Sequence, residues 1–300
     1  MRFGRTFYKL SGSGNDFVAF DGMAGGAGAE EPSPEAVRAL CRRGVGIGAD
    51  GVFVIRPVEG ADYQLLYYNA DGGRAALCGN ASLCSVRLAA ELGHFRGGEV
   101  RFMTDAGLTV GRLVDGMPEI DLAAPTEVST DRIELLGAGA ASHGSPARVG
   151  FARVGVPHVV ILCSDAERVE LERVAPPVRA HPSLADGANV NYVSRRPEGG
   201  WILRTFERGV EAETLACGTG SVATATLLSL WGELGASGGR GSLSSGVADG
   251  PVELVTRSGE VLRVRLRGAG GGMGAGRGLA PSLGGTARIV YRGELGEVSW

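Results

Sequence analysis

Two segments that lie far apart in the chain repeat one another and begin with the same Cys-Gly pair. Residues 78–93 read CGNASLCSVRLAAELG, and residues 217–232 read CGTGSVATATLLSLWG. Both have Ser at the fifth place, Leu at the eleventh and a final Gly, which is a common helix stop. The match predicts an internal duplication, so we expect two similar units that each contain one such helix. A pseudo-twofold axis between the units would bring the two helix starts face to face.

The rest of the chain is richer in strand patterns than in helix patterns. Short β-branched or aromatic runs bounded by turn residues predict strands at 17–20, 51–57, 63–69, 100–104, 158–163, 191–194, 201–206, 252–256, 261–266 and 287–293. Helices are expected at 34–43, 80–92, 165–174 and 219–231. The Gly-rich stretch 268–278 is expected to be a surface loop, because it has too few side chains to pack. This mixture predicts an α+β fold and not a doubly wound sheet.

Composition limits the classes of partner and of site. A net charge of -3 over 300 residues favours neither nucleic acid nor an anionic membrane, and no apolar run reaches the roughly 18 residues that a membrane-spanning helix needs. The first residues lack a signal-peptide pattern, so we expect a cytoplasmic protein. Five cysteines are an odd number, which argues against a disulfide framework, and the spacing of Cys78 and Cys84 does not suit zinc. We therefore expect reduced thiols and no metal.

A helix that begins at a cysteine has a specific chemistry. Its first backbone N–H groups are unpaired and lie at the positive end of the helix dipole, which suits a carboxylate. The same field raises the thiolate fraction of a neighbouring thiol, and Gly79 and Gly218 let the backbone approach a ligand closely. Two such helix starts could hold one carboxylate and place Cys78 and Cys217 on opposite faces of the attached carbon. This arrangement predicts racemisation or epimerisation of an amino acid by two bases.

The basic residues argue against the usual cofactor of such reactions. Most amino-acid racemases hold pyridoxal phosphate as a Schiff base on a lysine. Lys9 is the only lysine in this chain and lies in a predicted amino-terminal strand, which makes it a poor candidate. We therefore expect no cofactor, and the protein itself would stabilise the carbanion-like transition state with preorganised N–H donors.

Ordered motifs along nearly the whole chain resemble those of the diaminopimelate epimerase family. They are KLSGSGNDFVAFDG (9–22), CRRGVGIGADG (41–51), YNADGGRAALCGN (68–80), GVPHVVI (155–161), GANVNYV (187–193), FERGVEAETLACGTG (206–220) and ARIVYRGEL (287–295). The resemblance implies two similar domains, each a mostly antiparallel sheet wrapped around a central helix, comprising residues 1–124 with 282–300 and residues 125–281. It also implies cofactor-independent interconversion of LL- and meso-diaminopimelate, a step toward lysine and peptidoglycan.

The resemblance also assigns roles to residues of this sequence. It makes Cys78 and Cys217 the acid–base pair and gives the reacting carboxylate to the backbone of four residues: Gly79, Asn80, Gly218 and Thr219. It assigns substrate binding, largely at the far end, to Asn15, Asn69, Asn189, Glu207 and Arg208. His158 and Glu207 are expected to tune the thiols. The partner implied is a small amino-acid substrate, and a homodimer is one assembly that such a chain could form.

Departures from the family pattern leave two alternatives open. Val156 stands where the family has an asparagine that helps to bind the distal carboxylate, and CGNASLC replaces the family's C-G-N-G-A-R-C. One alternative is a related cofactor-independent racemase with another substrate, such as histidine or hydroxyproline. The other is a non-catalytic ligand-binding relative on the same fold. Such relatives usually lack the cysteine pair, so the presence of Cys78 and Cys217 argues against the second alternative.

Overall fold

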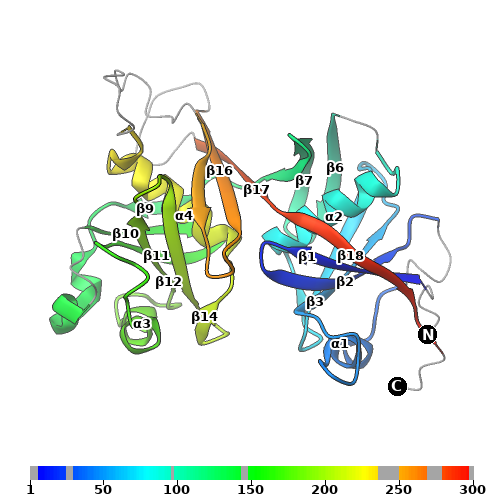
Figure 1. The fold of residues 1–300 in the computed structure, drawn as a ribbon, viewed down its shortest axis with the longest axis horizontal. Helices are drawn as coiled ribbons and strands as arrows, with labels where there is room; N and C mark the ends of the chain where they lie inside the picture. The colour runs from blue at the N-terminus through cyan, green and yellow to red at the C-terminus, as the bar shows by residue number, and fades with distance from the viewer. Residues whose placement is uncertain are drawn as a thin grey trace. The chain divides into compact units, whose positions relative to one another are not determined.

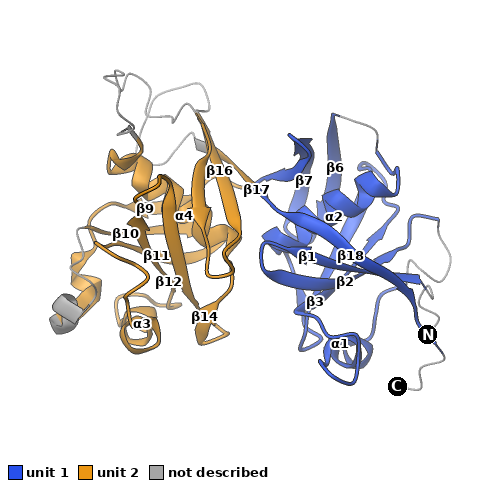
Figure 2. Cartoon of the chain, in the orientation of Figure 1, with its two compact units in different colours: residues 1–121, 284–300 blue, residues 122–283 orange. Residues whose placement is uncertain are grey.

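The chain folds into two compact units, which Figure 2 shows in different colours. The structure is a computed structural model that describes residues 6–24, 30–95, 98–142, 148–235, 250–268 and 279–296. Unit 1 contains residues 1–121 and 284–300, and unit 2 contains residues 122–283. The changes of unit thus follow Asp121 and Leu283, where the sequence interpretation placed them after 124 and 281.

The described part of unit 1 consists of short strands and two helices (Figure 1). Its elements are β1 (Thr6–Gly12), β2 (Asn15–Asp21), α1 (Pro34–Cys41), β3 (Gly51–Arg56), β4 (Tyr63–Asn69), β5 (Arg74–Ala75), α2 (Gly79–Glu91), β6 (Glu99–Thr104), β7 (Gly107–Val114), β8 (Met117–Asp121) and β18 (Ala287–Glu294). The carboxy-terminal β18 pairs with β1 in antiparallel fashion, so the last described strand of the chain returns to the first.

Unit 2 has the same kind of elements (Figure 1). They are β9 (Thr126–Ser129), the 3-10 segment η2 (Ile133–Ser142), β10 (Arg148–Val154), β11 (Val156–Leu162), α3 (Leu171–Arg179), β12 (Asn189–Arg195), β13 (Trp201–Glu207), β14 (Ala212–Thr214), α4 (Gly218–Leu230), η3 (Glu233–Gly235), β15 (Val252–Val255), β16 (Val261–Gly268) and most of β17 (Leu279–Gly285). Neither unit contains, in its described part, a helix long and apolar enough to cross a membrane.

Strand pairing repeats from one unit to the other. In unit 1, β1–β2, β3–β4 and β6–β7 are antiparallel, whereas β2–β3 is parallel across α1 and β4–β6 is parallel across β5 and α2. In unit 2, β10–β11, β12–β13 and β15–β16 are antiparallel, whereas β11–β12 is parallel across α3 and β13–β15 is parallel across β14 and α4. The internal duplication and the mostly antiparallel α+β fold are therefore confirmed.

The two repeated segments form the central helices α2 and α4. α2 contacts strands β1, β3, β4, β7, β8 and β18 of unit 1, and α4 contacts β10, β11, β12 and β16 of unit 2. Every residue of α4 from Gly220 to Leu228 is buried, as expected for a helix that strands cover on several sides. Both helices end before a glycine with positive φ, 76° at Gly93 and 75° at Gly232. The glycine stops expected from the sequence are thus confirmed.

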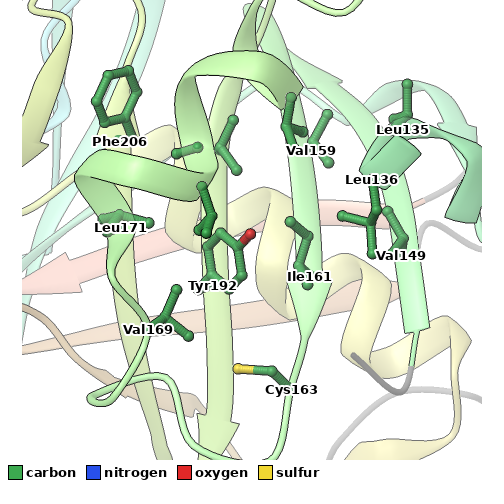
Figure 3. Close-up of a cluster of buried hydrophobic side chains, with 14 of the residues drawn as sticks. Leu135, Leu136, Val149, Val159, Ile161, Cys163, Val169, Leu171, Tyr192 and Phe206 are labelled. Carbon is green, nitrogen blue, oxygen red and sulfur yellow. The ribbon is translucent and has the colours of Figure 1, made fainter. Parts of the chain in front are cut away.

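Each unit has a second apolar core between its sheet and its other helix. In unit 1, Val37 and Leu40 of α1 pack with Val52 and Val54 of β3. In unit 2, α3 and η2 pack against the strands, and Figure 3 shows Ile161 of β11 and Tyr192 of β12 within this cluster. These cores fix the registers of the strands whose ends carry the candidate site residues.

One helix lies elsewhere than expected. The helix expected at about 165–174 is present, but its predicted bounds were wrong, because α3 covers Leu171–Arg179 and contains Pro176 and Pro177. Proline normally destabilises a helix interior. Here Leu171, Val174, Ala175 and Val178 form an i, i+3, i+4, i+7 stripe that is buried in the core, and this burial outweighs the proline penalty. The Gly-rich stretch begins with Gly268, the last residue of β16, and its other residues lie outside the described part of the chain.

Candidate active site

The two cysteines of the repeated segments occupy the same structural position. Cys78 is the N-cap of α2, with φ -132° and ψ 117°, and Cys217 is the N-cap of α4, with φ -132° and ψ 109°. In both helices the first backbone hydrogen bond returns to the carbonyl of the cysteine, from Ser82 and from Ser221. The N–H groups between them form the first turn and have no backbone acceptor within the helix. Each helix start therefore offers a thiol beside a set of anion-binding N–H donors.

The residues expected to hold the carboxylate lie in these first turns. Gly79 and Asn80 are the first two residues of α2, and Gly218 and Thr219 are the first two of α4. Of these four, only Asn80 is buried. Gly79, Gly218 and Thr219 are half-buried, so each first turn keeps part of its surface accessible next to the cysteine.

Cys78 lies beside an aromatic hydroxyl that the sequence interpretation did not single out. The Cys78 side chain makes no capping bond to α2 and is partly exposed. Tyr67 of β4 is its neighbour: burial first, and the Cys78 thiol second, raise the pKa of Tyr67 well above its usual range. Tyr67 therefore stays protonated and can donate its hydrogen to a Cys78 thiolate. Phe17 packs edge-on against the Tyr67 ring, with the ring centroids 6.0 Å apart.

A chain of amides extends from the start of α2 to a carboxylate. Asn80 Nδ2 donates to Asn15 Oδ1 at 2.6 Å, and Asn15 Nδ2 donates to Asp50 Oδ2 at 3.0 Å. A carboxylate only accepts, so Asp50 fixes which end of the Asn15 amide faces it, and Asn15 fixes the Asn80 amide in turn. This leaves the buried Asn80 Oδ1 as an acceptor with no partner among the described residues.

Charged groups hold the far end of this chain in place. Arg43 donates to Asp50 Oδ1 at 2.9 Å and to Asp16 Oδ1 at 2.6 Å, and Lys9 donates to Asp16 Oδ2 at 2.7 Å. Burial raises the pKa of Asp16, but the hydrogen bonds and charges of Arg43 and Lys9 outweigh it and lower that pKa to about 2. The only lysine of the chain is thus 8% exposed and committed to an ion pair.

Cys217 lies in a more enclosed place than Cys78. It is 7% exposed, and its Sγ accepts from the backbone N–H of Gly220 at 3.4 Å and lies 3.6 Å from the Thr219 hydroxyl. A Cβ at Gly220 would lie 2.4 Å from Asn191 Oδ1 and 3.2 Å from Cys217 Sγ. Glycine is therefore needed at this position because Asn191 packs directly against the first turn of α4.

His158 is connected to this helix start through Asn191. His158 is fully buried on β11, and its Nδ1 lies 3.2 Å from Asn191 Nδ2. Asn191 Nδ2 also donates to the Val159 carbonyl at 3.0 Å, and Thr205 Oγ1 donates to Asn191 Oδ1 at 3.0 Å. Burial first, and the charge of Arg208 second, lower the pKa of His158 to about 3, so the imidazole is neutral.

The remaining predicted residues divide between the two units. In unit 2, Asn189 Oδ1 accepts from the Arg208 backbone N–H at 2.8 Å, and the Arg208 guanidinium donates to the Asp186 carbonyl at 2.7 Å. Burial raises the pKa of Glu207, and the Thr214 hydroxyl partly offsets this rise. In unit 1, Asn69 is exposed at the end of β4, and its backbone bonds to Gly73 and Gly72.

The structure thus joins several predicted residues and adds others. It links Asn15 to Asn80 and Asn189 to Arg208, whereas the Asn69 side chain makes no hydrogen bond to another described residue. The sequence interpretation missed Tyr67, Asp50 and Asn191. Asn191 carried a partial signal, because it opened the strand predicted at 191–194 two positions after Asn189, and in β12 (Asn189–Arg195) the two side chains share one face.

Comparison with known proteins connects this geometry to a family. The family described as "Diaminopimelate epimerase" matches residues 7–120 and 150–262. Diaminopimelate epimerase of Gemmatimonas aurantiaca is 45% identical over 294 residues, covering 97% of this chain and 99% of that protein. The diaminopimelate epimerase of Archaeoglobus fulgidus is 36% identical over 268 residues, covering 87% and 89%.

Solved structures with lower sequence identity share the fold. A phenazine biosynthesis protein of the PhzF family from Bacillus anthracis superposes with a TM-score of 0.70 at 15% identity, covering 97% of this chain and 98% of that one. A hydroxyproline epimerase from Agrobacterium vitis gives a TM-score of 0.63 at 17% identity, covering 98% and 94%. At these identities the similarity shows the fold alone, whereas the two curated relatives are 45% and 36% identical and the family match covers most of both units. The chain therefore belongs to the diaminopimelate epimerase family.

Proposed function

We propose that this protein interconverts LL- and meso-diaminopimelate by moving the proton on one α-carbon, using its own side chains and no organic cofactor. The observation that carries the proposal is the 45% identity to a diaminopimelate epimerase over 97% of the chain. The duplicated helix starts support it, because each presents a cysteine with the same backbone conformation. The product serves lysine and peptidoglycan synthesis, and a reaction that needs two reduced thiols suits the cytoplasm.

In this proposal Cys78 and Cys217 exchange the roles of base and acid. One cysteine, as the thiolate, removes the Cα proton: the C–H bond breaks, an S–H bond forms and the electron pair remains on carbon. The other cysteine, as the thiol, gives its proton to the opposite face, and its own S–H electrons become the new thiolate. Atoms and charge balance, and the reverse reaction uses the same groups with their roles exchanged.

Backbone donors of the two helix starts would stabilise the carbanion through the attached carboxylate. The negative charge would spread from Cα onto the carboxylate oxygens, and the N–H groups of Gly79, Asn80, Gly218 and Thr219 would bind them. Such preorganised donors need no reorganisation as the charge develops. Glu207, whose pKa burial raises, would tune a thiol and contact the substrate.

The far end of the substrate would bind to amides and one cation. Asn15, Asn69, Asn189 and Arg208 would hold the distal amino and carboxylate groups. Val156 opens β11 directly after Gly155, whose φ is 68°, and offers no hydrogen bond from its side chain where the family has an asparagine. This difference is the reason to test other substrates as well.

Proton exchange in deuterated water tests the substrate and the reaction together. We expect the protein to exchange the Cα proton of LL-diaminopimelate and to form the meso isomer, and to leave histidine, proline and hydroxyproline unchanged. Exchange of one of those monocarboxylic amino acids, without exchange of diaminopimelate, would overturn the substrate and keep the two-thiol chemistry. No exchange of any amino acid would overturn the activity itself.

A further inference from the structure

Three equivalent positions of the two units are filled by different chemistry. In unit 1, Phe17 of β2 pairs with Gly51 of β3. Phe53 lies two residues after Gly51 on the same strand and pairs with Tyr67 of β4. In unit 2, His158 of β11 pairs with Asn189 of β12. Asn191 lies two residues after Asn189 on the same strand and pairs with Thr205 of β13. The register therefore places His158, Asn191 and Thr205 where unit 1 has Phe17, Phe53 and Tyr67.

Packing alone does not call for a histidine, an asparagine and a threonine at these positions. The aromatic set of unit 1 fills the same place with ring centroids 6.2 Å and 6.0 Å apart. Burial of polar groups costs free energy unless every group finds a partner. A polar set in unit 2, where an aromatic set serves unit 1, points to a role beyond packing.

The hydrogen bonds of Asn191 fix the direction of its amide. Nδ2 lies 3.0 Å from the Val159 carbonyl, which can only accept, so the NH₂ group must be on that side. Thr205 Oγ1 lies 3.0 Å from Oδ1 and supplies the hydrogen there. An amide turned the other way would bring two carbonyl oxygens together, so this orientation is the favourable one.

The Asn191 amide in turn fixes the protonation of His158. The second hydrogen of Asn191 Nδ2 points to His158 Nδ1, 3.2 Å away. A hydrogen on Nδ1 would face that hydrogen, so Nδ1 must carry the lone pair and Nε2 the proton. The charge that acts on His158 from its surroundings is that of Arg208, a cation that disfavours an imidazolium, as does complete burial.

His158 Nε2–H is a buried donor with no acceptor among the described residues. An unsatisfied buried donor is costly, and one that is oriented so firmly is ready for an acceptor that arrives with the reaction. An anionic acceptor, either a cysteine thiolate or a substrate carboxylate, gains most from a neutral N–H donor in such a place.

We propose that His158 acts in the epimerisation as a fixed neutral hydrogen-bond donor through Nε2–H and not as a proton acceptor, and that Asn191 is the positioning residue that sets this tautomer. This inference rests on the proposed function. It also states how His158 tunes the thiols. His158 stabilises an anion by donating a hydrogen bond and takes no proton from a thiol.

Nitrogen NMR tests the tautomer without any assay of activity. The chain has four histidines, and the spectrum of His158→Gln assigns the signals of His158 in the ¹⁵N-labelled protein. We expect a protonated Nε2 and an unprotonated Nδ1 for His158 throughout about pH 5 to 8, where an ordinary histidine titrates. A proton on Nδ1, or an imidazolium within this range, would overturn the proposal.

Kinetics tests the role. His158→Gln keeps an N–H donor at the place of Nε2 but removes the base, so we expect it to stay within about tenfold of wild type in kcat/KM. His158→Leu removes the donor and should lose roughly 10- to 100-fold more than His158→Gln, the worth of one hydrogen bond to a charged group. Equal losses in the two variants would overturn the donor role.

A substitution of Asn191, the positioning residue, should change both the tautomer seen by NMR and the rate of the reaction. Asn191→Asp places only acceptors beside Nδ1, so Nδ1 should take the proton, Nε2 should lose it, and kcat should fall by roughly 10- to 100-fold. Thr205→Val is the matched control, because the Val159 carbonyl still orients Asn191 and the tautomer should persist. If Asn191→Asp does not fold, the wild-type NMR spectrum still tests the tautomer, and the comparison of His158→Gln with His158→Leu still tests the donor role. An inactive wild type with the expected tautomer would overturn the proposed function and this role, but not the tautomer.

Discussion

The starts of α2 and α4 have the same backbone but different surroundings. Cys78 is partly exposed beside Tyr67. Its helix start is connected by hydrogen bonds through Asn80 and Asn15 to Asp50, which accepts from the Arg43 guanidinium. Cys217 is 7% exposed, and its helix start packs against the neutral Asn191. The duplication therefore supplies the thiol and the N–H donors twice, whereas the side chains from the strands give each thiol its own environment.

In the proposed mechanism the duplication serves geometry, and the divergence of the two copies serves chemistry. A reaction that inverts one carbon in both directions needs a group on each face that can give or take a proton, and each copy would contribute one such group. The two faces of an amino acid are not alike, however, so the neighbours of the two copies need not be alike. The pairing of strands is the part that stayed the same.

The largest effect is expected from the pair of thiols, where the two units should be equivalent. Cys78→Ala and Cys217→Ala should each lower kcat for diaminopimelate by about 10²- to 10⁴-fold, because each removes one group that transfers a proton. Unfolding in urea should show both variants folded. Near-normal epimerisation in either variant would show that only one unit carries the chemistry.

The free energy of unfolding should depend more on the aromatic residues of unit 1 (Phe17, Phe53 and Tyr67) than on the polar residues at the equivalent positions of unit 2 (His158, Asn191 and Thr205). Phe53 is fully buried, so Phe53→Ala should lower the free energy of unfolding by about 3–5 kcal/mol. Asn191→Ala should lower it by only about 1–3 kcal/mol, the usual result of leaving hydrogen-bond partners unpaired. Urea denaturation measures both values. A larger loss for Asn191→Ala than for Phe53→Ala would mean that the polar set serves mainly to hold unit 2 together.

The charged end of the amide chain in unit 1 should act on substrate binding. Asp50→Asn removes the carboxylate that orients Asn15, and we expect KM for diaminopimelate to rise about tenfold with little change in kcat, the worth of roughly one hydrogen bond. Glu35→Gln is the control, because Glu35 is exposed and its ion pair is with Arg38 on the same helix, α1. An unchanged KM in Asp50→Asn would show that Asn15 is oriented without it.

The smallest effect is expected where unit 2 departs from the family pattern. Val156→Asn restores an amide that would contact the ground state and the transition state equally. It should therefore lower KM for diaminopimelate by up to about tenfold and leave kcat unchanged. Steady-state kinetics of the two proteins side by side measures this. Unchanged KM and kcat in Val156→Asn would place this position outside the substrate site.

Local pattern was sufficient for the elements that carry the two cysteines. The repeated segments predicted both central helices, their glycine stops and the duplication, because helix capping and periodicity depend on residues a few positions apart. The same reasoning found strands such as β3, β4, β12 and β13. It failed at α3, where burial of an apolar stripe against the sheet outweighs two prolines that are visible in the sequence.

Tertiary structure alone decided which polar groups meet. Asn80 and Asn15 are 65 positions apart and Asn15 and Asp50 are 35 apart, and nothing in their local sequence states that they form one chain of hydrogen bonds. Likewise, the sequence showed that His158 and Asn191 exist but not that one sets the tautomer of the other. Hydrogen bonds between distant residues depend on strand register, and the register is set by the burial of whole sheet faces rather than by any one segment.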